Sequence, residues 1–279
     1  MKFFALILSL LVVSGCSMQT QPADGIDRDG LAEQLAGQQT EEPSASPEAS
    51  AEVKTDFTPE PTSEAVSIDI SSVGEGPDGY YTTIEGYDAV VYPGLPDGAN
   101  YNTLIIGDSL TVGLFANSDL HGARVYARVN AHTRQMIDEL ENFAGGYIDE
   151  SIDKVIVTLG SNDRGEDISY EYKNLIDYIR EEMPASEIFI SVIPYANEKK
   201  AADAGYDDVS ETDFDNTNRS IRALAGYGEN ISVCEALQEP WAKVIVTDEE
   251  ASTDGLHFTQ DMYKKWAARL YELGLLSKQ

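Results

Sequence analysis

Five short apolar runs, separated by amphipathic and polar stretches, constrain the fold of this 279-residue chain more than any other feature. We expect buried β-strands at residues 103–107, 123–129, 154–159, 187–193 and 231–234. Between these runs, residues 133–143 and 169–183 carry apolar side chains at helical spacing, and Pro184 ends the second stretch. Strands that alternate with helices form parallel sheets with helices on both faces, so the pattern predicts an α/β domain. Binding sites in such sheets collect at the carboxyl ends of the strands.

The two ends of this domain carry weaker signals. Residues 80–102 are rich in Gly, Pro and Tyr, and we expect no more there than one or two short strands or a wrapping segment. At the other end, a final helix is predicted, with Thr259 as its N-cap. Its apolar stripe consists of Met262, Trp266, Leu270 and Leu273.

The first 16 residues are typical of an export signal. Lys2 precedes an apolar run from Phe3 to Val13, which is too short to span a bilayer but suits a secretory signal peptide. The sequence Val13-Ser14-Gly15-Cys16 resembles a bacterial lipobox, which implies removal of residues 1–15 and a lipid on Cys16. The alternative is an ordinary cleaved signal peptide with a coincidental cysteine. The lipobox predicts a lipid-anchored protein of the bacterial cell envelope that faces outside the cytoplasm.

Residues 16–79 have the composition of a tether. Between residues 17 and 79, 14 acidic side chains outnumber two basic ones, and Phe57 is the single aromatic residue. Such a segment cannot bury enough apolar surface to offset its conformational entropy, so we expect disorder. It either spaces the domain at 80–279 from the membrane or is a low-complexity tail without consequence.

Charge and cysteine content exclude several classes of function. The formal net charge of −30 repels phosphate backbones, which argues against a nucleic-acid partner and leaves the lipid anchor as the expected membrane contact. Two cysteines cannot make a disulfide framework, and no Cys or His cluster has the spacing of a structural zinc site. We therefore expect neither a metal nor a disulfide scaffold.

Three short motifs lie at or near the expected element boundaries. They are Gly107-Asp108-Ser109-Leu110 after the first strand, Gly160-Ser161-Asn162-Asp163 after the third, and Asp254-Gly255-Leu256-His257 near the C-terminus. A serine at a tight strand-to-helix turn exposes its hydroxyl beside the N–H groups of the first helical turn. In this order the three motifs resemble those of the SGNH (GDSL) hydrolase superfamily, over residues 102–275.

The resemblance implies a fold and a chemistry. The fold is a three-layer α/β/α sandwich with a five-stranded, flavodoxin-like parallel sheet, and the reaction is ester hydrolysis without metal or organic cofactor. Ser109 is implied as the nucleophile, His257 as the general base and Asp254 as the residue that orients it. The backbone N–H of Ser109 and the side-chain amide of Asn162 are implied as donors to the oxyanion.

One block departs from the family pattern. A glycine N–H usually completes the oxyanion hole after the second strand, but no glycine lies between Gly122 and Gly145. Ala131 is the best match for this slot, and it would be strained if the slot required a positive φ. The third oxyanion donor, and with it the catalytic efficiency, depends on this backbone conformation.

The residue types support this chemistry independently. A serine hydroxyl needs an adjacent base, and of the three histidines only His257 has a carboxylate three residues before it. We expect His121 in a surface loop and His132 as a solvent-facing polar residue, although its position also allows a substrate contact. Asp108 is expected to shape its turn and Asp163 to hold its loop.

These features together predict a carboxylic ester hydrolase acting on a small acyl-ester or acylated-carbohydrate substrate. An exported, tethered and acidic domain favours O-acyl groups, above all acetyl, on cell-envelope or extracellular carbohydrate. A lysophospholipase or thioesterase acting on longer acyl chains is the alternative among enzymes. A non-catalytic SGNH scaffold that binds glycan is the alternative outside them, and a two-lobed solute-binding protein fits the single domain less well. The sequence gives no indication of the oligomeric state.

Overall fold

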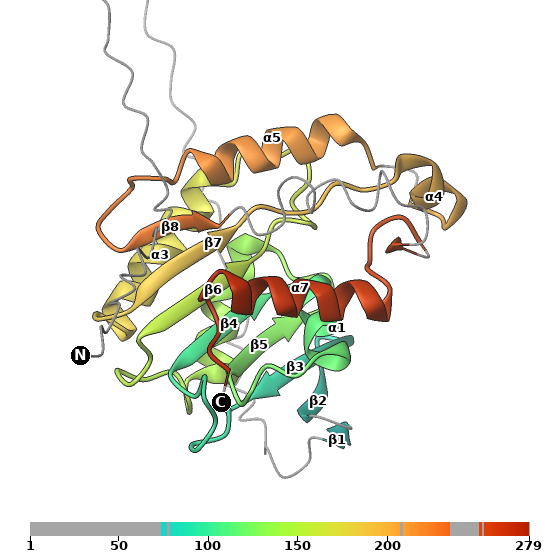
Figure 1. Ribbon diagram of the computed structural model, residues 1–279. Helices are drawn as coiled ribbons and strands as arrows, with labels where there is room; N and C mark the ends of the chain where they lie inside the picture. Colours follow the sequence, from blue (N-terminus) through green and yellow to red (C-terminus); the bar gives the residue numbers. More distant parts are fainter. Residues whose placement is uncertain (1–73, 77–78, 207–208, 235–250, 253, 279) are drawn as a thin grey trace, which may run out of the picture. The chain divides into compact units, whose positions relative to one another are not determined.

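One eight-stranded sheet organises the part of the chain that the computed structural model describes (Figure 1). The described residues are 74–76, 79–206, 209–234, 251–252 and 254–278, and all of them belong to one compact unit, Pro61–Gln279. Cys16, the signal peptide expected at 1–15 and most of the tether expected at 16–79 lie outside the described residues, so these expectations stay predictions. The strands follow the order β1-β2-β3-β5-β4-β6-β7-β8.

Five parallel strands form one side of the sheet. They are β4 (Thr103–Gly107), β5 (Arg124–Arg128), β6 (Lys154–Thr158), β7 (Glu187–Ser191) and β8 (Ile231–Cys234). Their spatial order β5-β4-β6-β7-β8 is the one typical of flavodoxin-like sheets, and each neighbouring pair is parallel. Every residue of β4 and β5 is buried, as expected where helices cover both faces. The five predicted parallel strands are present, but they belong to a larger, mixed sheet of eight strands, so the predicted strand count of the sheet is wrong.

Three antiparallel strands extend this sheet beyond β5. They are β1 (Gly74–Gly76), β2 (Gly79–Ile84) and β3 (Tyr87–Tyr92), and Val90 of β3 pairs with Ala127 of β5. Glu85 and Gly86 join β2 to β3 with φ values of 53° and 85°, a left-handed geometry suited to two-residue hairpin loops. At most two strands were expected here, and the domain was expected to start at residue 80. Strand pairing starts instead at Gly74. Strand β1 was not predicted because its sequence, Gly-Glu-Gly, lacks the alternation of apolar residues that is typical of a strand.

The helices complete a three-layer arrangement. They are α1 (Ser109–Asn117), η2 (Thr133–Gln135), α2 (Met136–Glu139), η3 (Leu140–Ala144), α3 (Ser169–Glu182), α4 (Glu198–Asp203), α5 (Glu211–Arg222) and α7 (Gln260–Glu272). Helices α1 and α7 pack against each other on the near face of the sheet in Figure 1, and α3 lies behind it. Helix α3 in turn contacts η2, α2 and α5. The α/β/α class is therefore confirmed.

Two helices differ in detail from the expectation. The single helix expected at 133–143 is divided into 3₁₀, α and π turns. In α7, Met262, Trp266 and Leu270 are buried, but Leu273 follows the helix and is 41 % exposed. Thr259 is the N-cap residue as predicted, but its side chain makes no capping hydrogen bond.

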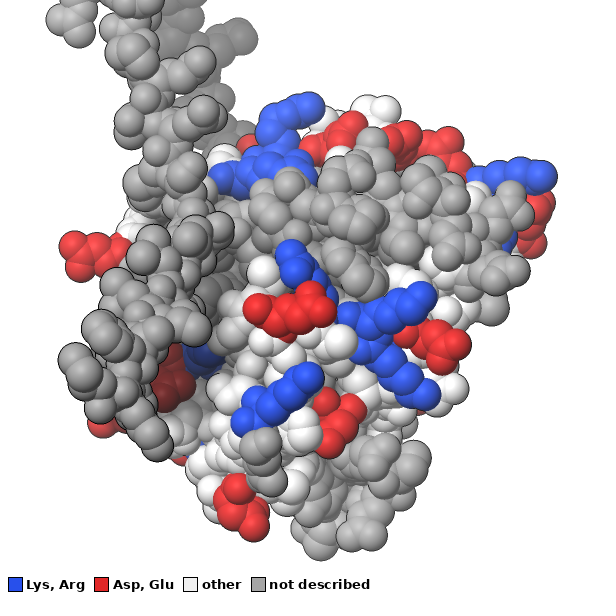
Figure 2. All heavy atoms as spheres, viewed as in Figure 1, with Lys and Arg blue, Asp and Glu red and all other residues white. Residues whose placement is uncertain are grey.

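The surface of α7 carries both signs of charge. Basic and acidic side chains are interspersed over this helix on the face shown in Figure 2. Lys264, Lys265 and Arg269 belong to α7 together with Asp261 and Glu272, so the acidic excess of the chain is not uniform over the surface. In the part of the chain that the structure describes, no helix has the length and apolar character needed to cross a membrane.

Candidate active site

Ser109 lies where a tight turn joins β4 to α1. Asp108 alone separates Gly107, the last residue of β4, from Ser109, the first residue of α1. A Cβ atom at position 107 would overlap the hydroxyl oxygens of Thr111 and Thr158, so this position requires glycine. Ser109 thus lies just beyond the carboxyl end of β4, where the sequence predicts the site.

Asp108 does more than shape this turn. Its Oδ1 accepts a hydrogen bond of 3.0 Å from the N–H of Leu110, which caps α1. Its Oδ2 accepts two hydrogen bonds, one of 2.6 Å from the Ser161 hydroxyl and one of 3.3 Å from the Ser161 N–H. Burial raises the pKa of the Asp108 carboxyl, and these hydrogen bonds partly oppose that rise. The turn that carries Ser109 is thereby tied to the loop after β6.

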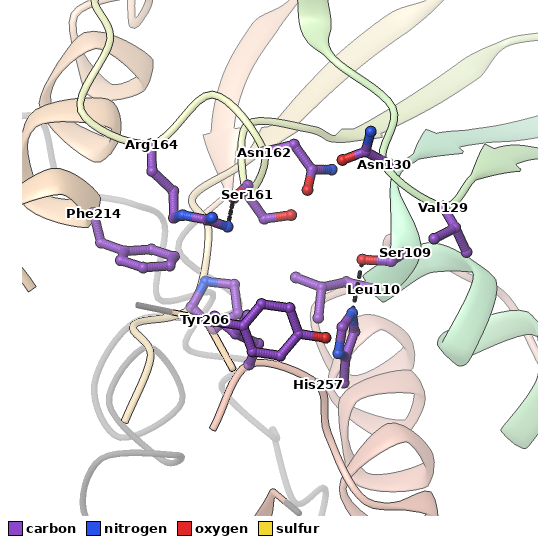
Figure 3. Close-up of a pocket in the computed structure, with 12 residues that line it drawn as sticks. Ser109, Leu110, Val129, Asn130, Ser161, Asn162, Arg164, Tyr206, Phe214 and His257 are labelled. Carbon is purple, nitrogen blue, oxygen red and sulfur yellow. Dashed lines mark hydrogen bonds between the residues drawn. The ribbon is translucent and has the colours of Figure 1, made fainter. Parts of the chain in front are cut away.

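Ser109, His257 and Asp254 form one hydrogen-bonded line. His257 Nε2 lies 2.9 Å from Ser109 Oγ, and His257 Nδ1 lies 2.7 Å from Asp254 Oδ2 (Figure 3 shows the first of these). Asp254 Oδ1 accepts hydrogen bonds from the backbone N–H groups of Leu256 and His257, at 2.9 and 2.8 Å. An isolated bridge between Ser252 and Phe258 closes this loop beside the start of α7. The structure thus brings together three residues that the sequence singled out.

The local environment of Asp254 and His257 shifts their pKa values in opposite directions. Burial raises the pKa of Asp254, but the hydrogen bonds from the His257 ring and from two backbone N–H groups outweigh it and hold that pKa well below its usual range. The hydrogen bond to Asp254 raises the pKa of His257 above its ordinary value of 6.5, with burial partly opposing it. Asp254 is therefore ionised at neutral pH, and it favours the tautomer in which Nδ1 of His257 carries the proton. That tautomer leaves Nε2 able to accept a proton from Ser109.

The expected oxyanion donors are only partly in place. The Asn162 side chain lines the same pocket as Ser109, with one amide N–H donated to the carbonyl of Ala131 at 3.0 Å. Since an amide group has two N–H bonds, the second is geometrically available to a bound oxygen. The N–H of Ala131, however, donates a hydrogen bond of 3.1 Å to the carbonyl of Arg128. Ala131 was the expected third donor, and this is wrong, because its N–H closes a turn instead.

The unusual backbone conformation lies one residue earlier, at Asn130. Its φ is +61°, in the left-handed region that asparagine tolerates better than most residues. Asn130 lines the pocket beside Asn162, and Figure 3 shows the two side chains close together. Ala131 has no positive φ, so the strain considered for it does not arise, and the left-handed conformation lies at Asn130.

The loops after β5 and β6 are cross-linked by Asp163. This carboxylate is 2 % exposed and accepts from both the N–H and the hydroxyl of Thr133, at 2.9 and 2.8 Å. His132 Nδ1 lies 2.7 Å from its other oxygen. Asp163 holds its loop as expected, whereas His132 is bound to Asp163 and does not simply face solvent. His121 lies in a surface loop as predicted, beside Asp119.

The triad opens into a pocket of about 340 Å³ (Figure 3). Ser109 and His257 lie at one end of the close-up, and Arg164 and Phe214 at the other, with Tyr206 between them. The lining residues are Ser109, Leu110, Val129, Asn130, Ser161, Asn162, Arg164, Pro194, Tyr206, Phe214, Leu256 and His257. Within the described ranges, no three His, Cys, Asp or Glu side chains are grouped in a way that could hold a metal ion.

The similarity of this chain to known proteins is found in solved structures. No family model and no curated protein matches the chain, whereas 66 chains of solved structures do. A member of the lipolytic protein G-D-S-L family from Veillonella parvula is 19 % identical, with a TM-score of 0.45, over 61 % of this chain and 96 % of its own. The C-terminal catalytic domain of peptidoglycan O-acetyltransferase A from Streptococcus pneumoniae is 20 % identical, with a TM-score of 0.42, over 63 % and 92 %. An acetyl xylan esterase is 13 % identical, with a TM-score of 0.48, over 61 % and 98 %.

Two of the similar structures are described by the GDSL name, the protein from Veillonella parvula and a GDSL-like lipase from Parabacteroides merdae. The chain resembles the SGNH (GDSL) superfamily. At these low identities and TM-scores the likeness shows no activity for this chain. Sequence motifs mark Ser109, Asn162 and His257 of the site. No motif marks Tyr206 or Phe214, which reach the pocket from the segment around α4 and α5.

Proposed function

We propose that this protein is a serine esterase of the SGNH type that hydrolyses O-acyl esters through an acyl-Ser109 intermediate. The observation that carries the proposal is the continuous line from Ser109 Oγ through the His257 ring to Asp254. A hydroxyl within 2.9 Å of an imidazole nitrogen has the base that nucleophilic attack requires. A carboxylate on the other ring nitrogen stabilises the imidazolium that forms during attack.

The reaction follows in two steps. Ser109 Oγ attacks the ester carbonyl while its proton moves to His257 Nε2, and the resulting oxyanion accepts hydrogen bonds from the Ser109 N–H and the Asn162 amide. Breakage of the bond to the alcohol oxygen returns that proton to the departing alcohol. Water then attacks the acyl-Ser109 carbonyl, gives a proton to His257, and the acid leaves as the proton returns to Ser109 Oγ.

The substrate class we propose is an acetylated carbohydrate of the cell envelope or its surroundings. The pocket combines apolar side chains with the polar groups of Asn130, Ser161 and Asn162, which suits a hydroxylated alcohol better than a long acyl chain. A lipid on Cys16 would keep the enzyme at the membrane, outside the cytoplasm, with residues 17–73, which precede β1, as its spacer.

Hydrolysis of p-nitrophenyl acetate tests the catalytic proposal. Ser109→Ala is expected to lower kcat/KM by about 10³-fold or more, because the nucleophile is lost. Ser232→Ala, in β8 outside the pocket, is the matched control and should retain the parent rate. Equal rates for the Ser109→Ala variant and the parent would overturn the proposal and favour the glycan-binding scaffold.

Acyl-chain length and location are tested separately. A series of p-nitrophenyl esters should favour C2 over C8, and the reverse preference would indicate a lysophospholipase or thioesterase. Cys16→Ser should release the protein from the membrane fraction into the medium, whereas Cys234→Ser should leave it anchored. If the Cys16→Ser variant stayed in the membrane fraction, as the Cys234→Ser variant should, lipidation at Cys16 would be contradicted.

A further inference from the structure

The pocket contains a second serine, Ser161, whose hydroxyl is held by a buried carboxylate. Asp108 is 0 % exposed, and its Oδ2 accepts hydrogen bonds from the Ser161 hydroxyl at 2.6 Å and from the Ser161 N–H at 3.3 Å. Because Asp108 directly precedes Ser109, these contacts tie Ser161 to the turn that carries the nucleophile. Figure 3 shows Ser161 in the pocket between Arg164 and Ser109. A second hydroxyl is thus fixed in the pocket near the nucleophile.

The hydrogen bond to Asp108 leaves the Ser161 oxygen as an acceptor. A serine hydroxyl has one O–H donor and two acceptor lone pairs. The single O–H is directed at Asp108 Oδ2, and no group in the described part of the chain donates to Ser161 Oγ. If this O–H turned into the pocket, the buried Oδ2 would keep only the longer bond from the Ser161 N–H, which costs free energy. A ligand therefore has to supply the hydrogen for a bond with this oxygen.

The surroundings of Asp108 favour its accepting form. Its Oδ1 accepts a hydrogen bond of 3.0 Å from the Leu110 N–H, and its Oδ2 accepts two from Ser161. Burial raises the pKa of the Asp108 carboxyl, but all of these hydrogen bonds and the nearby His257 ring oppose that rise. Since donors occupy both of its oxygens, Asp108 keeps the Ser161 O–H turned away from the pocket.

The chemistry of the ester indicates which of its halves can donate to Ser161. An acetyl group has no N–H or O–H, and the ester linkage has none either. A carbohydrate, in contrast, carries free hydroxyls on the carbons next to the acetylated one. Tyr206 lines the same pocket, is 36 % exposed, and offers its ring to the apolar face of a sugar. The hydrogen-bond donor therefore belongs to the alcohol half.

We propose that Ser161, oriented by Asp108, accepts a hydrogen bond from a free hydroxyl next to the acetylated position of the substrate. This inference rests on the proposed esterase function and names the group that the enzyme recognises on the alcohol. Ser161 is a specificity-determining residue, whereas Asp108 is a positioning residue that acts through it. The preferred substrate is accordingly a singly acetylated vicinal diol, an arrangement that sugars provide.

The experiment compares the hydrolysis of 2-hydroxyethyl acetate with that of 2-methoxyethyl acetate. Both esters carry an oxygen on the carbon next to the ester-bearing carbon, but only the first can donate a hydrogen bond from it. Ser161→Ala should lower the preference of the parent for the hydroxyl ester, measured as the ratio of kcat/KM values, by about 5-fold to 10-fold, the contribution of one hydrogen bond. Ser161→Thr keeps a hydroxyl and should retain the preference. Comparing ratios between variants removes the difference in intrinsic reactivity of the two esters.

Asp108→Asn tests the orientation of the Ser161 hydroxyl. Asparagine is an equally good N-cap residue, so its Oδ1 still accepts from the Leu110 N–H. Its amide NH₂ replaces the Oδ2 acceptor and donates to Ser161 Oγ, which turns the Ser161 O–H into the pocket. The preference for the hydroxyl ester should then fall at least as far as in the Ser161→Ala variant. A preference equal to that of the parent would overturn the proposal.

Ser232→Ala, in β8 outside the pocket, is the matched control and should keep the ratio of the parent. If Ser161→Ala slowed both esters equally, the inference would be wrong, because Ser161 would then bind a group common to both reactions, such as the attacking water. If Ser109→Ala still hydrolysed both esters, the esterase proposal itself would fail. If Ser109→Ala were inactive and Ser161→Ala kept the ratio of the parent, only the inference about Ser161 would fail.

Discussion

His257 Nδ1 and Asp254 Oδ2 lie 2.7 Å apart, and this hydrogen bond determines the pH range in which Ser109 has a base. His257 accepts the serine proton only when its ring is neutral. Since Asp254 raises the pKa of His257 above 6.5, kcat/KM should fall as the pH drops through a value above 6.5. The measurement is a pH–rate profile on a neutral acetyl ester.

Asp254→Asn separates this explanation from other titrating groups. Without the Asp254 carboxylate the main cause of the raised His257 pKa is lost, so the acid limb should move to lower pH. The same change should lower kcat by up to about 10⁴-fold, because the tautomer is no longer fixed. An acid limb that stayed in place in the variant would show that a group other than His257 titrates there.

Asp163 positions the loop that carries Asn162 through its hydrogen bonds with His132 and Thr133. Asn162→Ala is expected to lower kcat by about 10²-fold, the cost of one oxyanion donor. Asp163→Ala removes the acceptor of His132 and Thr133, so the two loops loosen and kcat should also fall. If Asp163 acts only through Asn162, the double variant should be no slower than the Asn162→Ala variant.

Thermal unfolding of the Asn162→Ala, Asp163→Ala and double variants provides the control for this comparison of kcat values. A structural role alone would lower Tm and leave kcat of the folded fraction unchanged. Losses in kcat that multiply in the double variant would contradict the positioning role, because independent effects are additive in free energy.

Asn130 allows a test of the backbone at the pocket. Its φ of +61° is free of strain for glycine but costs a β-branched residue about 1–2 kcal/mol or more. Asn130→Gly should keep the fold and much of the activity, whereas Asn130→Val should lower both Tm and kcat. Asn230, with φ of +62° in the turn before β8, is the matched control. Asn230→Val should lower Tm alone, and an equal effect of the two valine variants on kcat would contradict a role of the Asn130 backbone in the site.

Sequence and structure agree where a local pattern has one structural solution. The apolar residues Leu104–Ile106, flanked by Thr103 and Gly107, are typical of a strand buried on both faces, and β4 has the expected bounds. Ser109 and His257 were found through short motifs, although 148 residues separate them. Their distance of 2.9 Å depends on the packing of α7 against α1, which only the predicted final helix hinted at.

The rest depends on contacts between segments, and a single sequence does not show these. Ala131 was predicted as a donor from its position after β5. The orientation of its peptide group decides whether its N–H points into the pocket or to the carbonyl of Arg128, and the sequence does not show this orientation. His132 looked like a solvent-facing residue, since nothing in its neighbours reveals Asp163 as its partner. Tyr206 joins the pocket from the region of α4, where no motif points to Ser109.

A buried ion pair joins strand β5 to helix α2. Arg128 of β5 and Glu139 of α2 are 1 % and 4 % exposed, and the guanidinium binds both carboxylate oxygens of Glu139. The hydroxyl of Tyr126 donates a hydrogen bond of 2.8 Å to the same carboxylate. Because Asn130 follows Arg128 by two residues, this network supports the backbone that lines the pocket.

Removal of Glu139 should therefore be costly in stability. Glu139→Ala leaves a buried guanidinium and a buried phenol without their acceptor, and the free energy of unfolding should fall by about 3–5 kcal/mol. Glu272→Ala breaks the exposed pair with Arg269, at 3.0 Å, and should cost about 1 kcal/mol or less, because water and salt screen such pairs. Urea unfolding at neutral pH measures both values in the same chain. If the two variants lost equal stability, the buried network would contribute no more than a surface ion pair, and its support of the pocket would have to be abandoned.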